Sequence, residues 1–315
     1  MYILGFDIGG TKCAVITAQW DGNNITILQK EKCLTDLSVS PEEMIEKLIA
    51  MADSILEKKP EAIGISCGGP LDSKQGIILS PPNLPGWDQV SIVEQLEQHY
   101  GVPTKLQNDA NACAVAEWKF GAGKGYRNMV FLTFGTGLGA GLILDGKLYS
   151  GTNDNAGEVG HIRLENFGPI GYGKSGSFEG FCSGGGIAQL GYSMALEKVQ
   201  TGVYPIYYKK GMSQKDITAK TIADAARLGD ETALKVYRIC GTYLGKGLSI
   251  VIDLLNPELI VIGSVFARSK DLLWETTIEE IQKEALRPSA NCCEIVPAAL
   301  GEQIGDYAAI AVALS

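Results

Sequence analysis

Several chemically informative residues are scarce in this sequence. Only 2 histidines occur among 315 residues, and the 8 cysteines form no CxxC pair. Cysteines this sparse exclude a disulfide scaffold. Cys13 and Cys67 lie inside apolar runs, where a buried, reduced thiol is the expected state. The cysteine pattern therefore favours a cytoplasmic protein.

Basic charge and long apolar runs are also lacking. The chain has 27 basic and 36 acidic residues, a net charge of −9, which argues against a nucleic-acid or anionic-membrane partner. The most apolar long window, residues 248–266, contains Asp253 and Glu258 and is not a membrane span. The first ten residues have no basic region, so we expect no secretory signal. The sequence predicts a cytoplasmic globular protein.

Glycine, by contrast, is abundant. The chain has 39 glycines in 315 residues, against an average usage of about 7%. They show no three-residue period, which excludes collagen, and gather in short bursts beside apolar runs. Such bursts indicate tight backbone turns around a ligand. The length favours two domains.

Apolar periodicity predicts an α/β chain. Strands are expected at 2–6, 13–18, 25–31, 61–67, 104–108, 128–134, 140–145, 259–263 and 294–296, and helices at 41–58, 91–99, 110–120, 186–199, 218–228, 231–254, 269–285 and 304–314. Two strand–glycine turn–strand units, within 2–18 and 128–145, suggest an internal duplication. Duplicated α/β domains that face each other would form a cleft, a common place for a ligand.

The turns of these two units are candidate phosphate sites. Residues 7–12 read DIGGTK, and residues 134–141 read FGTGLGAG. Without a Cβ, a glycine turn can bring amide groups against phosphate oxygens. Lys12 could add a positive charge there, and Asp7 could hold a hydrated Mg²⁺. The alternative for the first turn is an ordinary hairpin with an incidental acid; the second favours a phosphate cradle, as phosphoryl transfer requires.

Two further motifs carry candidate catalytic and binding groups. Residues 107–111 read QNDAN where a strand meets a helix, so Asp109 either caps the helix or acts as a base toward a substrate hydroxyl. Glu158 and His161 are three residues apart in a glycine-rich segment and could both contact a polyol. A buried structural histidine is the alternative. His99 lies in a charged helix and is expected at the surface.

The order DIGGTK, NDANA, FGTGLGAG and ExGH closely resembles the ROK family of bacterial sugar kinases and related repressors. The segments GGP at 68–70, PNLPGW at 82–87 and LG at 300–301 also resemble the family pattern. The resemblance covers essentially the whole chain. It implies an α/β fold of two actin/hexokinase-like (ribonuclease H-like) domains around a central cleft. The smaller N-terminal domain would comprise 1–108 plus 301–315, and the larger C-terminal domain 109–300.

The resemblance also implies a role for each candidate residue. Asp109 would be the catalytic base. The sugar ligands would be Gly69, Asn108, Asp109, Glu158, His161 and Glu179. ATP and Mg²⁺ would be bound through Asp7, Gly9, Gly10, Thr11, Lys12, Gly135, Thr136, Gly137 and Gly263, with Asp7 reaching the metal through water. Ser264 stands where a second glycine is usual.

One segment departs from the family. Zinc-binding members carry a CGCGxxGC pattern whose three cysteines join the ExGH histidine, but this sequence has Ile170, Tyr172 and Ser177 at those positions. Isoleucine offers no ligand atom, so we predict no structural zinc. Apolar contacts from Ile170, Tyr172, Phe178 and Phe181 are expected to hold the loop instead.

The sequence therefore predicts an ATP-dependent kinase of a hexose or N-acyl-hexosamine, glucokinase-like and acting at O6. The resemblance implies a homodimer. A non-catalytic ROK-type sugar-sensing or sugar-binding protein is the alternative. ROK repressors carry a helix-turn-helix ahead of the first phosphate motif, which begins here at residue 7. That position and the acidic charge disfavour a DNA-binding role.

Overall fold

The computed structural model describes residues 1–315 and confirms the predicted α/β class. Its internal contacts divide the chain into two compact units. Unit 1 comprises Met1–Arg127, Gly141–Ala156 and Ala299–Ser315, and unit 2 comprises Asn128–Ala140 and Gly157–Ala298. Residues 109–127 and 141–156 thus group with unit 1, whereas the sequence placed them in the C-terminal domain. The difference arises because helix α3 (Asp109–Phe120) packs against the C-terminal helix α10 (Ile304–Ala313).

Unit 1 is built on a five-stranded sheet of order β3-β2-β1-β4-β7. Its strands are β1 (Tyr2–Ile8), β2 (Lys12–Trp20), β3 (Ile25–Leu34), β4 (Ala62–Cys67) and β7 (Thr104–Asn108). The first three strands pair antiparallel, which confirms the predicted hairpin, and β4 and β7 continue the sheet parallel to β1. The carboxyl ends of β1, β4 and β7 therefore share one edge of the sheet.

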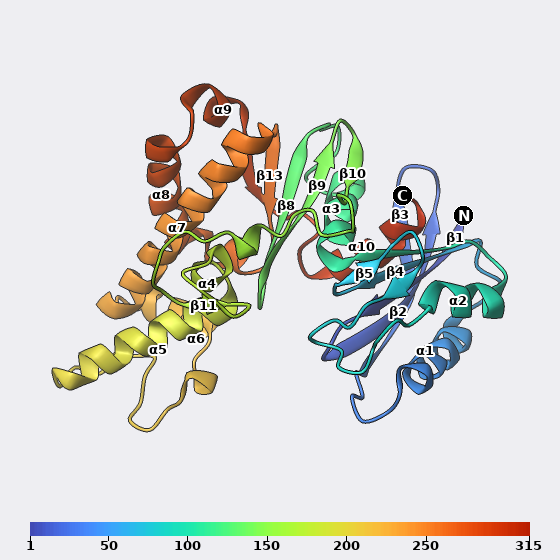
Figure 1. Ribbon diagram of the computed structural model, residues 1–315, viewed down its shortest axis with the longest axis horizontal. Helices are drawn as coiled ribbons and strands as arrows, with labels where there is room; N and C mark the ends of the chain where they lie inside the picture. The colour runs from blue at the N-terminus through green and yellow to red at the C-terminus, as the bar shows by residue number, and fades with distance from the viewer. The chain divides into compact units, whose positions relative to one another are not determined.

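Helices cover both faces of this sheet (Figure 1). Along β1, Leu4 and Phe6 pack in the cluster under α1 (Pro41–Ile55) and α2 (Ile92–Tyr100), whereas Ile3 packs with α10. This alternation is the two-residue period of a strand buried on both sides. Helix α1 begins at a capping box formed by Ser40 and Glu43.

Helix α10 lies unusually close to the sheet because two strand positions are glycine. A Cβ at Gly64 would lie 2.0 Å from the carbonyl oxygen of Ala309, and a Cβ at Gly5 would lie 3.0 Å from the Ala309 Cβ. Both distances are shorter than ordinary carbon contacts. The small-residue helix predicted at 304–314 thus packs directly on the backbone of β1 and β4.

The second sheet repeats the strand order of the first. Its order is β10-β9-β8-β13-β14, with β8 (Met129–Phe134), β9 (Leu138–Leu144), β10 (Lys147–Tyr149), β13 (Leu259–Ile262) and β14 (Glu294–Pro297). Strand β13 runs parallel to both β8 and β14, as β4 does to β1 and β7. The matching orders are what an internal duplication predicts.

The helices of unit 2 are α4 (Phe178–Phe181), α5 (Gly184–Gln200), α6 (Ala219–Arg227), α7 (Glu231–Leu255), α8 (Val265–Glu284) and α9 (Arg287–Cys292). Helix α8 begins earlier than the predicted 269–285, and Ser269 interrupts it with non-helical dihedral angles, φ −132° and ψ 25°. No helix combines the length and apolarity needed to cross a membrane.

Sequence periodicity did not reveal the shortest elements. These are the hairpins β5 (Leu71–Asp72) with β6 (Ile77–Ile78) and β11 (Ile170–Gly171) with β12 (Lys174–Ser175), together with β10, α4, α9 and the 3₁₀ turns η1 (Val159–His161), η2 (Gln214–Asp216) and η3 (Gly301–Gln303). Each spans too few residues to show a period of two or 3.6.

Hydrogen bonds stabilise the loop at residues 170–177, whose sequence differs from that of the zinc-binding family members. The Ser177 hydroxyl oxygen accepts a hydrogen bond from the Gly180 N–H at 3.1 Å and so caps α4. The same hydroxyl donates to the Gly171 carbonyl at 3.4 Å. The Lys174 ammonium donates to the His161 carbonyl at 2.7 Å, and Arg163 donates to the Ser175 carbonyl at 2.7 Å. The positions of the missing cysteines thus lie within a network of backbone contacts.

Apolar contacts of aromatic side chains also stabilise this loop. Phe178 is fully buried, and Phe181 stacks on Tyr243 of α7 with ring centroids 3.5 Å apart. Ile170 and Tyr172 are 54% and 70% exposed. The expectation that all four side chains hold the loop is therefore right for the two phenylalanines and wrong for Ile170 and Tyr172. The hairpin turn between β11 and β12 directs the latter pair to solvent.

The residues at the cysteine positions do not supply a tetrahedral zinc site, because His161 is joined there by an isoleucine, a tyrosine and a serine. We expect protein purified without added metal to contain no stoichiometric zinc, and its melting temperature to be unchanged by 1,10-phenanthroline. Elemental analysis measures the first and a thermal scan the second. The triple variant I170C/Y172C/S177C is the positive control, and one zinc per native chain contradicts the prediction.

Candidate functional site

The carboxyl edge of the first sheet gathers the unit 1 candidates. In the strand register, Ile8 of β1 lies beside Cys67 of β4, and Cys67 lies beside Asn108 of β7. Asp7, the penultimate residue of β1, thus lies near the edge at which Gly69 follows β4 and Asp109 follows β7. A Cβ at Gly69 would lie 3.0 Å from the Asn108 amide nitrogen, so these two candidates are in contact.

Asp109 is the first residue of α3, and Asn108 is its N-cap. The Asn108 side-chain oxygen accepts from the Ala110 N–H at 2.9 Å, and Asp109 Oδ1 accepts from the same N–H at 2.7 Å. Capping is thus carried by Asn108, while the Asp109 side chain keeps much of its surface exposed to water. Desolvation by the surrounding protein raises the pKa of Asp109 against the lowering effect of the Ala110 hydrogen bond. A carboxylate that is accessible yet more basic than usual is suited to take a proton from a bound hydroxyl.

The first glycine turn is closed by a hydrogen bond from the Gly9 N–H to the Lys12 carbonyl at 3.1 Å. A Cβ at Gly10 would lie 2.2 Å from the Asn83 carbonyl oxygen, so only glycine fits there. The N–H groups of Gly10 and Thr11 donate to no protein acceptor. Exposed, unpaired amides in a tight turn are the arrangement that binds an anion. The PNLPGW segment at 82–87 is thereby explained as the support of this turn.

Asp7 lies in a group of charges that the sequence did not bring together. Lys30 of β3 forms an ion pair with Asp306, in the first turn of α10. A Cβ at Gly305 would lie 3.0 Å from Asp7 Oδ2, which places the Asp7 carboxylate at the start of that helix. Burial raises the pKa of Asp7 to about 7 together with the negative charges of Asp306 and Asp109, against the lowering effect of nearby lysines.

The second glycine turn is held by its carbonyl groups. The Gly184 and Gly185 N–H groups, at the start of α5, donate to the carbonyls of Gly135 and Thr136 at 2.7 and 3.3 Å. The Gly135 N–H donates to the Gly137 carbonyl at 3.0 Å, which closes the turn. The unpaired amides of a helix start are therefore satisfied by the turn. Glycines 184 and 185, which sequence reasoning left without a role, allow this approach.

Glu179 contacts the same turn from α4. Its Oε2 accepts from the Leu138 N–H at 2.9 Å, and a Cβ at Gly137 would lie 2.7 Å from that oxygen. A Cβ at Gly160 would lie 2.1 Å from the Leu138 carbonyl and 3.3 Å from the Glu179 Cβ. In unit 2, the second glycine turn, the ExGH motif and Glu179 therefore lie in one cluster.

His161 ends the 3₁₀ turn η1 and is exposed, so it is not the buried structural histidine that the sequence left open. Its ring meets the Tyr172 ring edge to face, with centroids 6.2 Å apart. Glu158 directly precedes η1 and is also exposed. Both side chains are accessible to a polar ligand.

Gly263 and Ser264, which the family resemblance places at the nucleotide, follow β13. The Gly263 N–H donates to the Leu132 carbonyl at 3.0 Å. Ser264, where a second glycine is usual, has φ 52° and ψ −109°, a conformation that favours glycine. A Cβ at Gly135 would lie 3.9 Å from the Ser264 hydroxyl, so this motif adjoins the second glycine turn.

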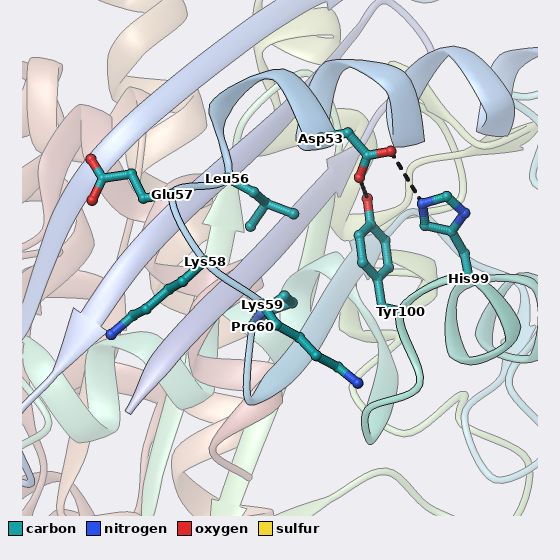
Figure 2. A pocket seen from close by; sticks show the side chains of 8 residues that line it. All are labelled: Asp53, Leu56, Glu57, Lys58, Lys59, Pro60, His99 and Tyr100. Carbon is teal, nitrogen blue, oxygen red and sulfur yellow. Dashed lines mark hydrogen bonds and ion pairs between the residues drawn. The ribbon is translucent and has the colours of Figure 1, made fainter.

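An open surface hollow of unit 1 is not part of this arrangement. It has a volume of about 550 Å³ and is lined by the segment 56–60 with Asp53, His99 and Tyr100 (Figure 2). Asp53 already accepts from Tyr100 at 3.0 Å and lies 3.1 Å from the His99 ring. The hollow adjoins the residues that lead into β4 and β7, at the amino edge of the sheet. It lies opposite the edge that carries Asp7 and Asp109.

Known proteins resemble this chain along nearly its whole length. A glucokinase of Thermotoga maritima is 30% identical over 315 residues, which covers 98% of this chain and 96% of the relative. The structure of a ROK family glucokinase from Streptomyces griseus in complex with glucose and AMPPNP matches with a TM-score of 0.80 at 29% identity, covering 100% and 99% of the two chains. A xylose repressor of Bacillus spizizenii is 27% identical, with 96% of this chain and 74% of the repressor covered.

The family profile agrees with these pairwise similarities and with the fold. The ROK family profile matches residues 3–315. The strand order, the two glycine turns and the glucokinase-like architecture are all consistent with that match. The chain belongs to the ROK family.

Proposed function

We propose that this protein is an ATP-dependent sugar kinase that phosphorylates a hexose or N-acyl-hexosamine at O6. Asp109 takes the proton from the attacking hydroxyl. The sugar ligands are Gly69, Asn108, Glu158, His161 and Glu179. The two glycine turns bind the phosphates of ATP, whose nucleoside side is bound near Gly263. Glucokinases among the relatives support this reading at about 30% identity.

The observation that carries the proposal is the position of Asp109. It follows β7 at the edge where β1 ends, next to Asp7, and where β4 leads to Gly69. Its helix is already capped by Asn108, so the carboxylate is not required for that purpose. A base must face the substrate hydroxyl while phosphate groups are held close by, and phosphoryl transfer depends mainly on such positioning.

The residues around Asp7 fit a magnesium ion bound with ATP. The Asp7 carboxylate accepts no hydrogen bond from the protein, and burial together with two neighbouring carboxylates raises its pKa. A cation would relieve this repulsion. Mg²⁺ in ATP sites is commonly held by one or two carboxylates, phosphates and water, so a set of three protein ligands is not needed. When bound, Mg²⁺ neutralises charge on the transferred phosphate, and Asp7 would orient its water shell.

Replacing the base tests the assignment of Asp109. We expect Asp109→Ala and Asp109→Asn to lower kcat by at least about 10²-fold, the usual scale for general-base catalysis, while sugar binding stays measurable by calorimetry. Glu46→Gln, at an exposed position of α1, is the matched control and should retain wild-type kcat. Turnover within a few-fold of wild type in both Asp109 variants would show that another group is the base.

A coupled ADP-release assay tests the reaction itself. We expect activity on at least one of glucose, mannose, fructose, allose, N-acetylglucosamine and N-acetylmannosamine, with the phosphate located on O6 of the product by NMR. Sugar binding without ADP release would instead support the non-catalytic sugar-binding alternative. No binding and no turnover with any of the six would contradict the proposed substrate class.

The Asp7 charge should oppose folding at neutral pH. Its pKa rises from 3.8 to about 7 on folding, so the folded state holds the proton more tightly than the unfolded state. The destabilisation is absent below pH 4, grows between pH 4 and 7, and is constant above. At about 1.4 kcal/mol per pKa unit, it is at most about 4 kcal/mol. We expect Asp7→Asn to be more stable than wild type at pH 8 and equal to it at pH 4, while losing activity.

Urea denaturation at pH 4, 6 and 8 measures this difference. Asp36→Asn is the control, since hydrogen bonds from Ser38 lower the pKa of Asp36 and its loss should give no gain at high pH. A stability gain for Asp7→Asn that is the same at pH 4 and pH 8 would refute the electrostatic explanation.

A further inference from the structure

We propose that Glu179 is a positioning residue that couples the sugar site to the ATP site, in addition to contacting the sugar. The inference rests on the proposed function. It assigns to the two oxygens of one carboxylate two different tasks. One oxygen holds the second phosphate turn in its binding shape, and the other accepts from the sugar.

The first task is visible in the contact with the turn. Glu179 Oε2 accepts from the Leu138 N–H at 2.9 Å, directly after the phosphate motif 135–137. A Cβ at Gly137 would lie 2.7 Å from the same oxygen, so a side chain there would displace the Glu179 carboxylate from this position. A hydrogen bond to a charged acceptor is stronger than one between neutral groups. The carboxylate thus fixes the point at which the turn enters β9.

The second task belongs to the other carboxylate oxygen, Oε1, which takes no part in the contact with the turn. Glu179 Oε1 has no hydrogen-bond partner within the protein, although the side chain is partly buried. An ionised carboxylate can accept up to about four hydrogen bonds, so Oε1 is free to accept from water or from a ligand. The exposed ExGH residues adjoin it through Gly160, whose Cβ would lie 3.3 Å from the Glu179 Cβ. A sugar hydroxyl is a donor that fits this oxygen.

The surroundings of Glu179 prevent it from serving one site independently of the other. A Cβ at Gly171 would lie 2.8 Å from the Glu179 Cβ, and the Ser177 cap fixes the start of α4. The other side of the turn is fixed by the hydrogen bonds from Gly184 and Gly185. A shift of the carboxylate toward the sugar therefore changes the hydrogen bond to the turn. Sugar and nucleotide then bind with reciprocal coupling.

The test is the affinity for nucleotide in the absence of sugar. We expect Glu179→Ala and Glu179→Asp to weaken binding of MgADP by about 10-fold in calorimetry, because neither side chain reaches the Leu138 N–H. Glu179→Gln should stay within about 3-fold of wild type, since its carbonyl oxygen can accept the same hydrogen bond. His161→Ala is the matched control: it removes a sugar contact that has no bond to the turn, and should leave MgADP affinity unchanged.

The coupling has its own readout. In wild type, a saturating substrate sugar should change MgADP affinity, and this change should be lost in Glu179→Ala and Glu179→Asp. KM for ATP should rise in both variants, whereas in His161→Ala only KM for the sugar should rise. Wild-type MgADP affinity in Glu179→Ala and Glu179→Asp would overturn the inference while leaving the kinase proposal intact. A wild-type protein that binds no MgADP would overturn the kinase proposal, and the inference with it.

Discussion

Close approach of one backbone segment to another, allowed by glycine, is the constraint on which this structure depends. Helix α10 packs on the backbone of the first sheet at Gly64, and the first glycine turn packs on the backbone of Asn83 at Gly10. In unit 2, Gly137 meets a carboxylate and Gly184 meets the second turn. A methyl group at Gly10, Gly64 or Gly184 would force the neighbouring backbone to move, and one at Gly137 would displace the Glu179 carboxylate. The high glycine content is therefore a property of the packing as well as of the ligand sites.

The two glycine turns have similar sequences but are held by different neighbours. In the first turn the N–H groups of Gly10 and Thr11 are unpaired, and the turn packs against the irregular, proline-containing segment 82–87. The second is held on its carbonyl side by a helix start and on its amide side by Glu179. The two hairpins share their strand order, but the surroundings of their turns differ.

Long elements were predictable from the sequence, because strands buried on both faces are continuous apolar runs and amphipathic helices repeat about every 3.6 residues. Contacts between distant segments were not. Lys30 and Asp306 are 276 residues apart, and Leu138 and Glu179 are 41 apart, so no local pattern reports either pair. Ile170 and Tyr172 were misjudged because their apolar character suggested burial, whereas a two-residue strand pairing turns them outward. The proposed roles of Glu158 and His161 came from family resemblance rather than from their spacing.

The position of Glu179 also limits how this protein could be given a different sugar preference. A designer who changes residue 179 to suit a new hydroxyl pattern alters the support of the phosphate turn at the same time. Tyr172 supports no other part of the site. Its ring is exposed and contacts the His161 ring, and the hairpin that carries it is held by the hydrogen bond from the Ile170 N–H to Gln189. Directed evolution of substrate choice should therefore accumulate changes around the β11–β12 hairpin and leave the glutamate unchanged.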